Sequence, residues 1–117
     1  NNLAWIEAEN NGDLGKALLL AQTATTVTPD VPEIMDTLGW VYYKRDLPKL
    51  AAPLFARSAE KVPTNPIYHY HLGLANLRSG ETRAGRRALE RALEARPDEA
   101  AAADIRRLLS QLPAPSR

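Results

Sequence analysis

Apolar side chains recur along this chain at intervals of three and four residues, in runs of about a dozen residues. The run at residues 32–45 is the clearest, and it places four apolar side chains on one helical face: Ile34, Leu38, Val41 and Tyr42. No run shows the period-two alternation of a strand. The nearest case, Thr23 to Thr28, closes a helical run and is interpreted as a weak last turn. The pattern therefore predicts an all-α fold.

Turn and cap residues divide the pattern into successive helices. The predicted helices span residues 1–11, 13–27, 32–45, 47–61, 66–79, 81–95 and 98–112. Asp46 is expected to cap the helix that follows it, and Asp98 and Glu99 suit the N-terminus of the last helix. Pro53 conflicts with this assignment, because proline inside a helix removes a backbone hydrogen bond and costs roughly 3 kcal/mol. We expect a bend at Pro53 or a helix that starts later.

The helices pair into repeats of constant length. Pro29, Pro63 and Pro97 are evenly spaced, and Leu38-Gly39 recurs at the same interval as Leu72-Gly73. Different residue types that keep one period indicate a repeat array. We expect a single domain over residues 1–112 and a flexible tail at 113–117. The domain divides into units at about 1–29, 30–63 and 64–97 and a capping helix at 98–112.

This pattern resembles the tetratricopeptide repeat (TPR) family, whose units are helix–turn–helix hairpins of the same length. One unit carries Leu38-Gly39, Tyr42, Ala51, Phe55, Ser58 and Pro63, and the next carries Leu72-Gly73, Gly80, Gly85, Leu89, Ala92 and Pro97. Three positions depart from the family: Ala4 replaces a glycine, Asn76 an aromatic residue and Gly85 an alanine. The resemblance implies an α-solenoid of about three antiparallel hairpins plus a C-terminal capping helix, coiled as a right-handed superhelix.

A narrower likeness concerns the source of the chain. Asp36-Thr37-Leu38-Gly39-Trp40 is similar to the last repeats of large bacterial TPR proteins of surface-polysaccharide and protein-sorting systems. The N-terminus reads like the middle of a helix and lacks the features of a signal peptide, so we expect a fragment of a longer protein. No run is long and apolar enough to span a membrane. We expect a soluble protein of the bacterial cytoplasm or periplasm.

The resemblance also implies a concave groove lined by the first helix of each hairpin. The residue after each Leu-Gly pair would point into this groove, and Trp5, Trp40 and Leu74 occupy that position. The neighbouring groove positions are Glu9, Asp36, Tyr43, Lys44, Ile67, Tyr70 and Arg78. A large apolar strip with aromatic side chains is typical of an interaction surface. Trp5 and Trp40 are equally compatible with a place in the core between adjacent hairpins.

Nothing in the sequence points to catalysis or metal binding. Cysteine is absent, and no nucleophile elbow or glycine-rich phosphate loop occurs. His69 and His71 lie two residues apart on a predicted helix, whereas metal ligands on a helix are spaced by three or four. His71 is expected instead to form a hydrogen bond across the groove or to a neighbouring hairpin. Glu33 and Asp36 are interpreted as solvated surface. We expect no enzyme, no metal and no cofactor.

The charges favour no single kind of partner. Fifteen basic and 14 acidic side chains give a net charge of +1. The basic residues between Arg83 and Arg107 alternate with acidic ones, so we expect a solvated face with helical pairs such as Glu90 with Arg86 or Arg87. Nucleic-acid binding through the Arg83–Arg107 region is a weaker alternative. The family's carboxylate clamp is not implied, because its positions here lack lysine and arginine and hold Asn1, Trp5, Thr37, Ile67 and His71.

The sequence therefore predicts a scaffold that binds a peptide or helix of a partner protein in its groove. The partner's identity is not encoded in the repeat itself, because this kind of fold serves many functions. A structural solenoid segment that self-associates through its N-terminal edge is the alternative. Membrane insertion is not expected.

Overall fold

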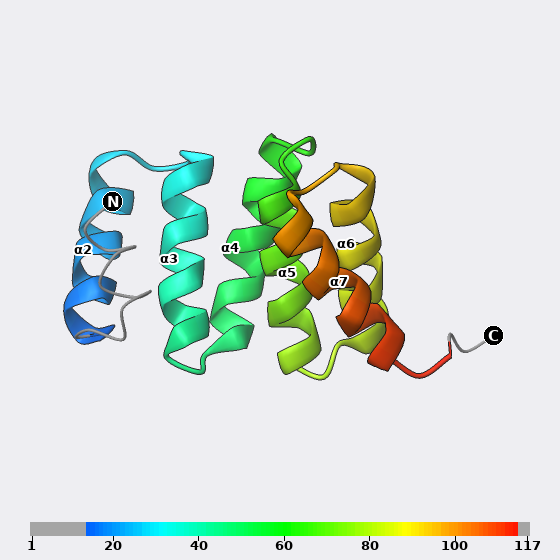
Figure 1. The fold of residues 1–117 in the computed structure, drawn as a ribbon. Helices are drawn as coiled ribbons and strands as arrows, with labels where there is room; N and C mark the ends of the chain where they lie inside the picture. The colour runs from blue at the N-terminus through cyan, green and yellow to red at the C-terminus, as the bar shows by residue number, and fades with distance from the viewer. Residues whose placement is uncertain (1–13, 115–117) are drawn as a thin grey trace.

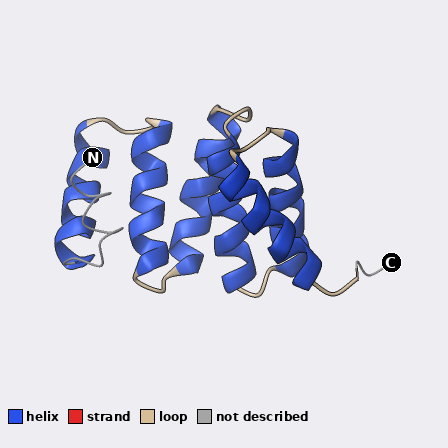
Figure 2. Cartoon of the chain, viewed as in Figure 1, coloured by secondary structure: helices blue, strands red, loops and turns tan. Residues whose placement is uncertain are grey.

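The computed structural model describes residues 14–114, and every regular element in that range is a helix (Figures 1 and 2). The helices are α2 (Leu14–Val27), α3 (Pro32–Lys44), α4 (Pro48–Lys61), α5 (Pro66–Arg78), α6 (Thr82–Glu94) and α7 (Glu99–Gln111). All six helices predicted within this range are confirmed to within one or two residues at their ends. The predicted helix at 1–11 lies outside the described residues.

The helices stack side by side as antiparallel hairpins, with α3 paired to α4 and α5 paired to α6 (Figure 1). Helix α4 also packs on α5, and α2 on α3, so neighbouring hairpins share their apolar faces. Helices α3 and α5 contact one another directly, whereas α4 has no comparable contact with α2 or α6. The first helices of the hairpins therefore lie on the inner, shorter side of the stack, and the second helices lie on the outer side.

Glycines at the hairpin interface allow the close approach of the two helices. A Cβ atom on Gly39 would lie 2.7 Å from the Phe55 ring, and one on Gly73 would lie 2.5 Å from Leu89. Phe55 and Leu89 are fully buried and stand at equivalent positions of the two repeats. Each Leu-Gly pair thus supplies a gap that a large side chain of the second helix fills, as the repeat pattern predicts.

The turn inside each hairpin is built from the same backbone hydrogen bonds. The N–H of Leu47 donates to the Tyr42 carbonyl at 2.9 Å, and the N–H of Glu81 donates to the Asn76 carbonyl at 2.8 Å. These six-to-one bonds, with a left-handed residue between them, form a Schellman cap. The left-handed positions are Asp46, with φ 62°, and Gly80, with φ 83°.

The prediction that Asp46 caps the following helix is wrong. Helix α4 begins after Leu47, and no side chain forms a capping hydrogen bond at its N-terminus. Asp46 ends α3 instead, because its short polar side chain tolerates the left-handed conformation better than most residues do. The prediction for Asp98 is confirmed: its carboxylate accepts a hydrogen bond from the N–H of Ala101 at 2.8 Å.

Two helices continue through residues that disfavour them. Helix α4 runs from Pro48 through Pro53 to Lys61, so it does not start later than predicted. Helix α2 extends through its threonines to Val27, where the hydroxyl groups donate to carbonyls four residues earlier, as Thr25 does to Ala21 at 2.9 Å. The residues predicted to form a weak last turn thus belong to α2 as far as Val27.

Candidate partner-binding face

Several residues that the sequence assigned to a groove belong to α3 and α5, the helices of the inner side. We use the name inner face for a set of partly buried and exposed side chains of α3, α5 and α7: Trp40, Tyr43, Lys44, Tyr70, Leu74, Arg78, Asp104 and Leu108. Trp40, Leu74 and Leu108 stand at equivalent positions of successive repeats. Lys44 and Arg78 are exposed, and the others are partly buried. The sequence therefore places an apolar row on this face, with charged residues beside it.

Aromatic rings and cations are stacked at one end of the inner face. The centroids of Trp40 and Tyr43 lie 5.3 Å apart with nearly parallel planes. The Lys44 ammonium lies 5.4 Å from the Trp40 ring centroid, and the Arg78 guanidinium lies 4.8 Å from that of Tyr43. Both distances fall within the range of cation–π attraction. Each cation is therefore held over a ring, although its charged end stays in contact with solvent.

Trp40 belongs to the packing between hairpins as well as to the inner face. It is partly buried and packs against two core clusters, one that includes Leu38 and Val41 and one that includes Ala51 and Phe55. Its ring also stacks on His71 of the next hairpin, with centroids 4.4 Å apart. The core interpretation thus applies to Trp40, and its place in a binding groove stays a prediction. One side of the indole contributes to the core, and the remainder is accessible.

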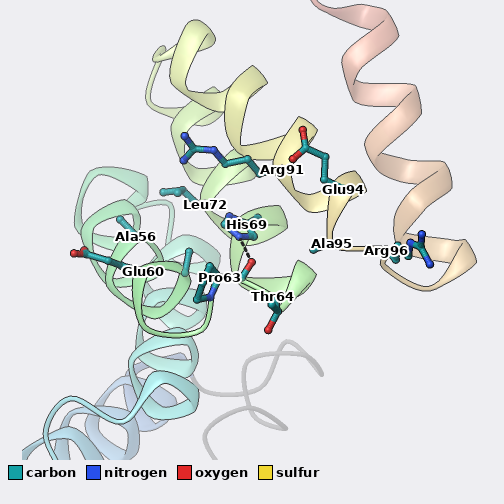
Figure 3. A pocket seen from close by; sticks show the side chains of 11 residues that line it. Ala56, Glu60, Pro63, Thr64, His69, Leu72, Arg91, Glu94, Ala95 and Arg96 are labelled. Atoms are coloured by element: carbon teal, nitrogen blue, oxygen red, sulfur yellow. Dashed lines mark hydrogen bonds between the residues drawn. The ribbon is translucent and has the colours of Figure 1, made fainter.

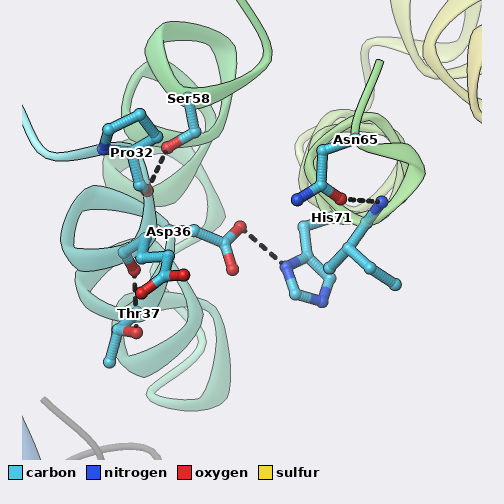
Figure 4. Close-up of polar contacts among 8 residues, drawn as sticks. Pro32, Asp36, Thr37, Ser58, Asn65 and His71 are labelled. Atoms are coloured by element: carbon cyan, nitrogen blue, oxygen red, sulfur yellow. Dashed lines mark hydrogen bonds and ion pairs between the residues drawn. The ribbon is translucent and has the colours of Figure 1, made fainter. Parts of the chain in front are cut away.

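A buried polar pair joins α3 to α5 behind this ring (Figure 4). His71 Nδ1 lies 2.8 Å from an oxygen of Asp36, and the two residues are 5% and 6% exposed. The expected hydrogen bond of His71 to a neighbouring hairpin is therefore confirmed. The interpretation of Asp36 as solvated surface is wrong, because a carboxylate on the inner side of α3 faces the next hairpin rather than water. Buried polar groups of this kind are stable only when they are hydrogen-bonded.

A second polar link joins α5 to α7. The Tyr70 hydroxyl donates to the Asp104 carboxylate, which also accepts a hydrogen bond from Arg107. Burial raises the pKa of Tyr70, and the hydrogen bond to Asp104 raises it further. The same hydrogen bond lowers the pKa of Asp104, against the smaller opposing effect of its partial burial. The sequence identified Tyr70 but not Asp104, which occupies the equivalent position one repeat later.

The remaining predicted groove residues are spread along the same helices. Ile67 lies in the first turn of α5 and is partly buried, and Asp36 is buried behind the surface. Trp5 and Glu9 lie outside the described residues. The structure thus brings together Trp40, Tyr43, Lys44 and Arg78 through direct ring contacts. Tyr70 contacts His71, whose ring centroid is 5.9 Å away.

The outer side carries a pocket that the sequence analysis did not predict (Figure 3). Its volume is about 800 Å³, and its walls come from α4, the start of α5 and the end of α6. Lining residues include Ala56, Ala59, Arg91 and Glu94, together with buried His69, whose Nε2 lies 2.8 Å from the Pro63 carbonyl. Small side chains of α4 leave room for this opening. Their spacing along the helix is the feature of the sequence that could have indicated a pocket here. The lining has no aromatic side chain other than the imidazole.

The basic residues of α6 and α7 form fewer ion pairs than predicted. Arg106 pairs with Glu99 at 3.1 Å, and Arg107 pairs with Asp104. Within residues 14–114, the expected pairs of Glu90 with Arg86 and Arg87 are not formed, and Arg86 donates to the Pro113 carbonyl instead. Exposed Arg83, Arg87 and Arg91 alternate with Glu90 and Glu94 along the outer side.

Metal-binding clusters and membrane spans are both absent from the part of the chain that the structure describes. Within that range, histidine, aspartate and glutamate side chains nowhere gather in the groups of three that hold a metal ion. Among the same residues, no helix combines the length and the apolar character needed to cross a membrane.

Comparison with known proteins gives a family match over part of the chain. The tetratricopeptide repeat family model matches residues 37–82. Among curated proteins, the human N-alpha-acetyltransferase 25, NatB auxiliary subunit, is 30% identical over 79 residues, and so is its mouse counterpart. The match covers 68% of this chain but 8% of each relative, so the chain spans a small part of their length.

Solved structures of the same architecture extend the match over the whole stack. The type III secretion chaperone SycD of Yersinia enterocolitica, in complex with a peptide of the translocator YopD, has a TM-score of 0.82 at 16% identity. That match covers 93% of this chain and 86% of SycD. A mutant O-GlcNAc transferase of Thermobaculum terrenum has a TM-score of 0.76 at 28% identity, over 89% of this chain and 21% of the transferase.

These relatives differ in source and in size. Human, mouse and bacterial proteins are all among them, so they do not indicate a bacterial origin for this chain. Residues 37–82 match the tetratricopeptide repeat family, and the described chain folds as a TPR-like solenoid of stacked antiparallel hairpins.

Proposed function

We propose that this chain is a protein-interaction module that holds a peptide or helix of a partner protein against the inner face. The observation that carries the proposal is the apolar row Trp40, Leu74 and Leu108 beside the stacked ring of Tyr43. Large, rigid aromatic side chains with part of their surface exposed are the residues that contribute most to protein interfaces. The chain offers no comparable cluster of rings on its outer side within residues 14–114.

The likeness to SycD supports the same interpretation, since that chaperone was solved with a peptide of its partner YopD. At 16% identity, the likeness to SycD supports the architecture alone. The proposed peptide site is argued from the residues of this chain. The scaffold role is proposed for the described residues alone. Repeats of this architecture also occur as part of a transferase, so the fold by itself does not decide what a longer protein does. The finer resemblance to bacterial repeats of surface-polysaccharide and protein-sorting systems stays a prediction.

A selection from a random twelve-residue peptide library displayed on phage tests the proposal. Wild-type protein should enrich peptides that contain apolar or aromatic residues, and Leu74→Ala should reduce their capture by about tenfold, as expected for the loss of an anchor contact. Leu74→Ala is chosen first because Leu74 does not belong to the three principal core clusters. Trp40→Ala is the second variant, and its fold is checked by circular dichroism because Trp40 also packs in the core.

The matched control is Arg91→Ala, which removes a side chain from the outer pocket and leaves the inner face unchanged. Capture that survives both Leu74→Ala and a folded Trp40→Ala but fails in Arg91→Ala would contradict the proposal, and it would assign binding to the outer side.

Two alternatives from the sequence have separate tests. Self-association through the N-terminal edge involves residues outside the described range, and it predicts a sedimentation coefficient that rises with protein concentration. Nucleic-acid binding through the Arg83–Arg107 region predicts a gel shift that weakens steeply with salt. The alternation of Arg83, Arg87 and Arg91 with Glu90 and Glu94 disfavours it.

A further inference from the structure

The acidic side chains of the inner face already have partners within the chain. Asp36 is buried and bonded to His71. Asp104 accepts hydrogen bonds from Tyr70 and Arg107. Burial keeps Asp36 away from a partner, and the ion pair with Arg107 offsets the charge of Asp104. These two carboxylates therefore offer little negative charge to a partner.

The basic side chains beside the apolar row have much weaker partners. Lys44 lies over the Trp40 ring and forms no ion pair with a carboxylate of the described residues. Arg78 lies over the Tyr43 ring and is 3.6 Å from Asp46, and the two side chains of this pair are 50% and 81% exposed. An ion pair so exposed contributes little and is readily exchanged for another carboxylate.

The positions of the two cations are set by the rings beneath them. Trp40 and Tyr43 stack on each other, so Lys44 and Arg78 are held over adjacent rings at the same end of the inner face. Cations in the last turn of a helix also complement the negative end of its dipole. That effect explains a basic residue at the end of α3 or α5, but it does not require either residue to cover a ring.

We infer that the partner segment carries both an acidic and an apolar side chain, with the carboxylate at the end of the inner face where Lys44 and Arg78 lie and the apolar group on Trp40 and Leu74. This inference rests on the proposed function and adds the chemistry of the partner to it. The inner face then matches an acidic and apolar peptide by charge as well as by shape, since its two strongly exposed charged residues, Lys44 and Arg78, are positive. A guanidinium and an ammonium at the same end of the inner face both attract a carboxylate.

The spacing of the partner's two residues follows from its conformation. In an extended peptide, side chains on one face are two residues apart, and in a helix they are three or four apart. The aspartate or glutamate should therefore lie at a fixed distance of two, three or four residues from the apolar anchor.

The phage-displayed twelve-residue library tests this inference with wild type and the double variant Lys44→Gln, Arg78→Gln. Wild type should enrich peptides in which aspartate or glutamate accompanies a leucine or aromatic residue at a fixed spacing. The double variant should still enrich apolar residues but lose the acidic preference. Both substitutions lie on exposed side chains, so the fold should be retained. The matched control is Arg87→Gln, Arg91→Gln on the exposed side of α6, which should keep the acidic preference.

A synthetic peptide from the wild-type selection then gives the affinity. Fluorescence anisotropy should show binding about three- to tenfold weaker when its acidic residue is replaced by the matching amide, because rim ion pairs contribute modestly. The same amide replacement should have no effect on binding to the Lys44→Gln, Arg78→Gln variant.

The outcomes separate the inference from the proposed function. Peptides that depend on Leu74 but show no acidic preference, or keep it in the double variant, overturn the inference and leave the interaction module intact. An absence of Leu74-dependent peptides overturns both. An acidic preference lost equally in the Arg87→Gln, Arg91→Gln control reflects general charge attraction and also overturns the inference.

Discussion

At the scale of single residues, the absence of one side chain sets the spacing of each hairpin. Gly39 lies against Phe55, and Gly73 lies against Leu89 at the equivalent place in the next repeat. A Cβ atom at either glycine would come within 2.7 Å of a buried carbon. Close-packed interiors do not absorb such an overlap without shifts of backbone or rotamer.

Gly39→Ala should therefore lower the free energy of unfolding by about 1–3 kcal/mol, through overpacking against the Phe55 ring. Urea denaturation followed by circular dichroism measures the change. Adding Phe55→Leu to Gly39→Ala should recover part of the loss, because the smaller side chain makes room for the new methyl group. If the double variant loses more free energy of unfolding than the two single variants lose in total, the ring and the glycine are not coupled in this way.

The pKa of Asp104 gives a prediction on pH. Its pKa lies below the ordinary value of 3.8, mainly because the Tyr70 hydroxyl donates to the carboxylate. A lowered pKa in the folded state stabilises the protein above the unfolded pKa, and this contribution is lost as the pH falls through the folded value. As the pH falls below about 4, wild type should lose more stability than Asp104→Asn does.

Thermal melting at a series of pH values measures this difference. Tyr70→Phe is the companion variant, since it removes the donor and should reduce the same acid-dependent loss. Equal acid sensitivity of wild type, Asp104→Asn and Tyr70→Phe would mean that the link between α5 and α7 does not depend on the charge of this carboxylate.

At the scale of elements, the helices followed from the sequence because three independent signals agreed. The apolar spacing indicated their extent, the prolines indicated their ends, and the repeat placed equivalent helices at a constant interval. Two of the wrong interpretations concern aspartates. Asp46 was expected to begin a helix and instead ends one, and Asp36 was expected to be solvated and is buried.

Both errors have the same physical origin. A short polar side chain stabilises a helix N-terminus, a left-handed turn or a buried partner equally well, and local sequence does not distinguish these uses. The partner of Asp36 is His71, on a different hairpin. The burial of Asp36 follows from the stacking of hairpins, which the residues around it do not encode.

Pro53 is the least favourable residue of α4, since it lies inside the helix and lacks the N–H that would donate to the Lys49 carbonyl. Pro53 is exposed, so its replacement does not disturb the core. Pro53→Ala should raise the free energy of unfolding by about 1–3 kcal/mol, the helical gain being reduced by the greater freedom of the unfolded chain. Urea denaturation measures the gain. Ala103→Ser, at an exposed position of α7, is a control whose free energy of unfolding should change little. A loss of stability in Pro53→Ala would mean that the proline makes a contact that outweighs the missing hydrogen bond.

At the scale of the whole molecule, the stack presents two different sides. The inner face is lined by first helices in mutual contact, and it carries the stacked rings and the cations that cover them. The outer side has an open pocket of small and charged residues between α4 and α6. The stacking of hairpins, rather than any single residue, keeps these two surfaces on opposite sides, so a ligand on one leaves the other free.

The most direct test of the inner face as the binding site is an NMR titration of isotope-labelled protein with a peptide from the phage selection. We predict shifts for the Trp40 side chain and for amides of α3 and α5, with residues of the outer pocket such as Ala56 and Glu94 unchanged. Shifts that instead gather around Ala56, Leu72 and Glu94, with Trp40 unaffected, would contradict this assignment.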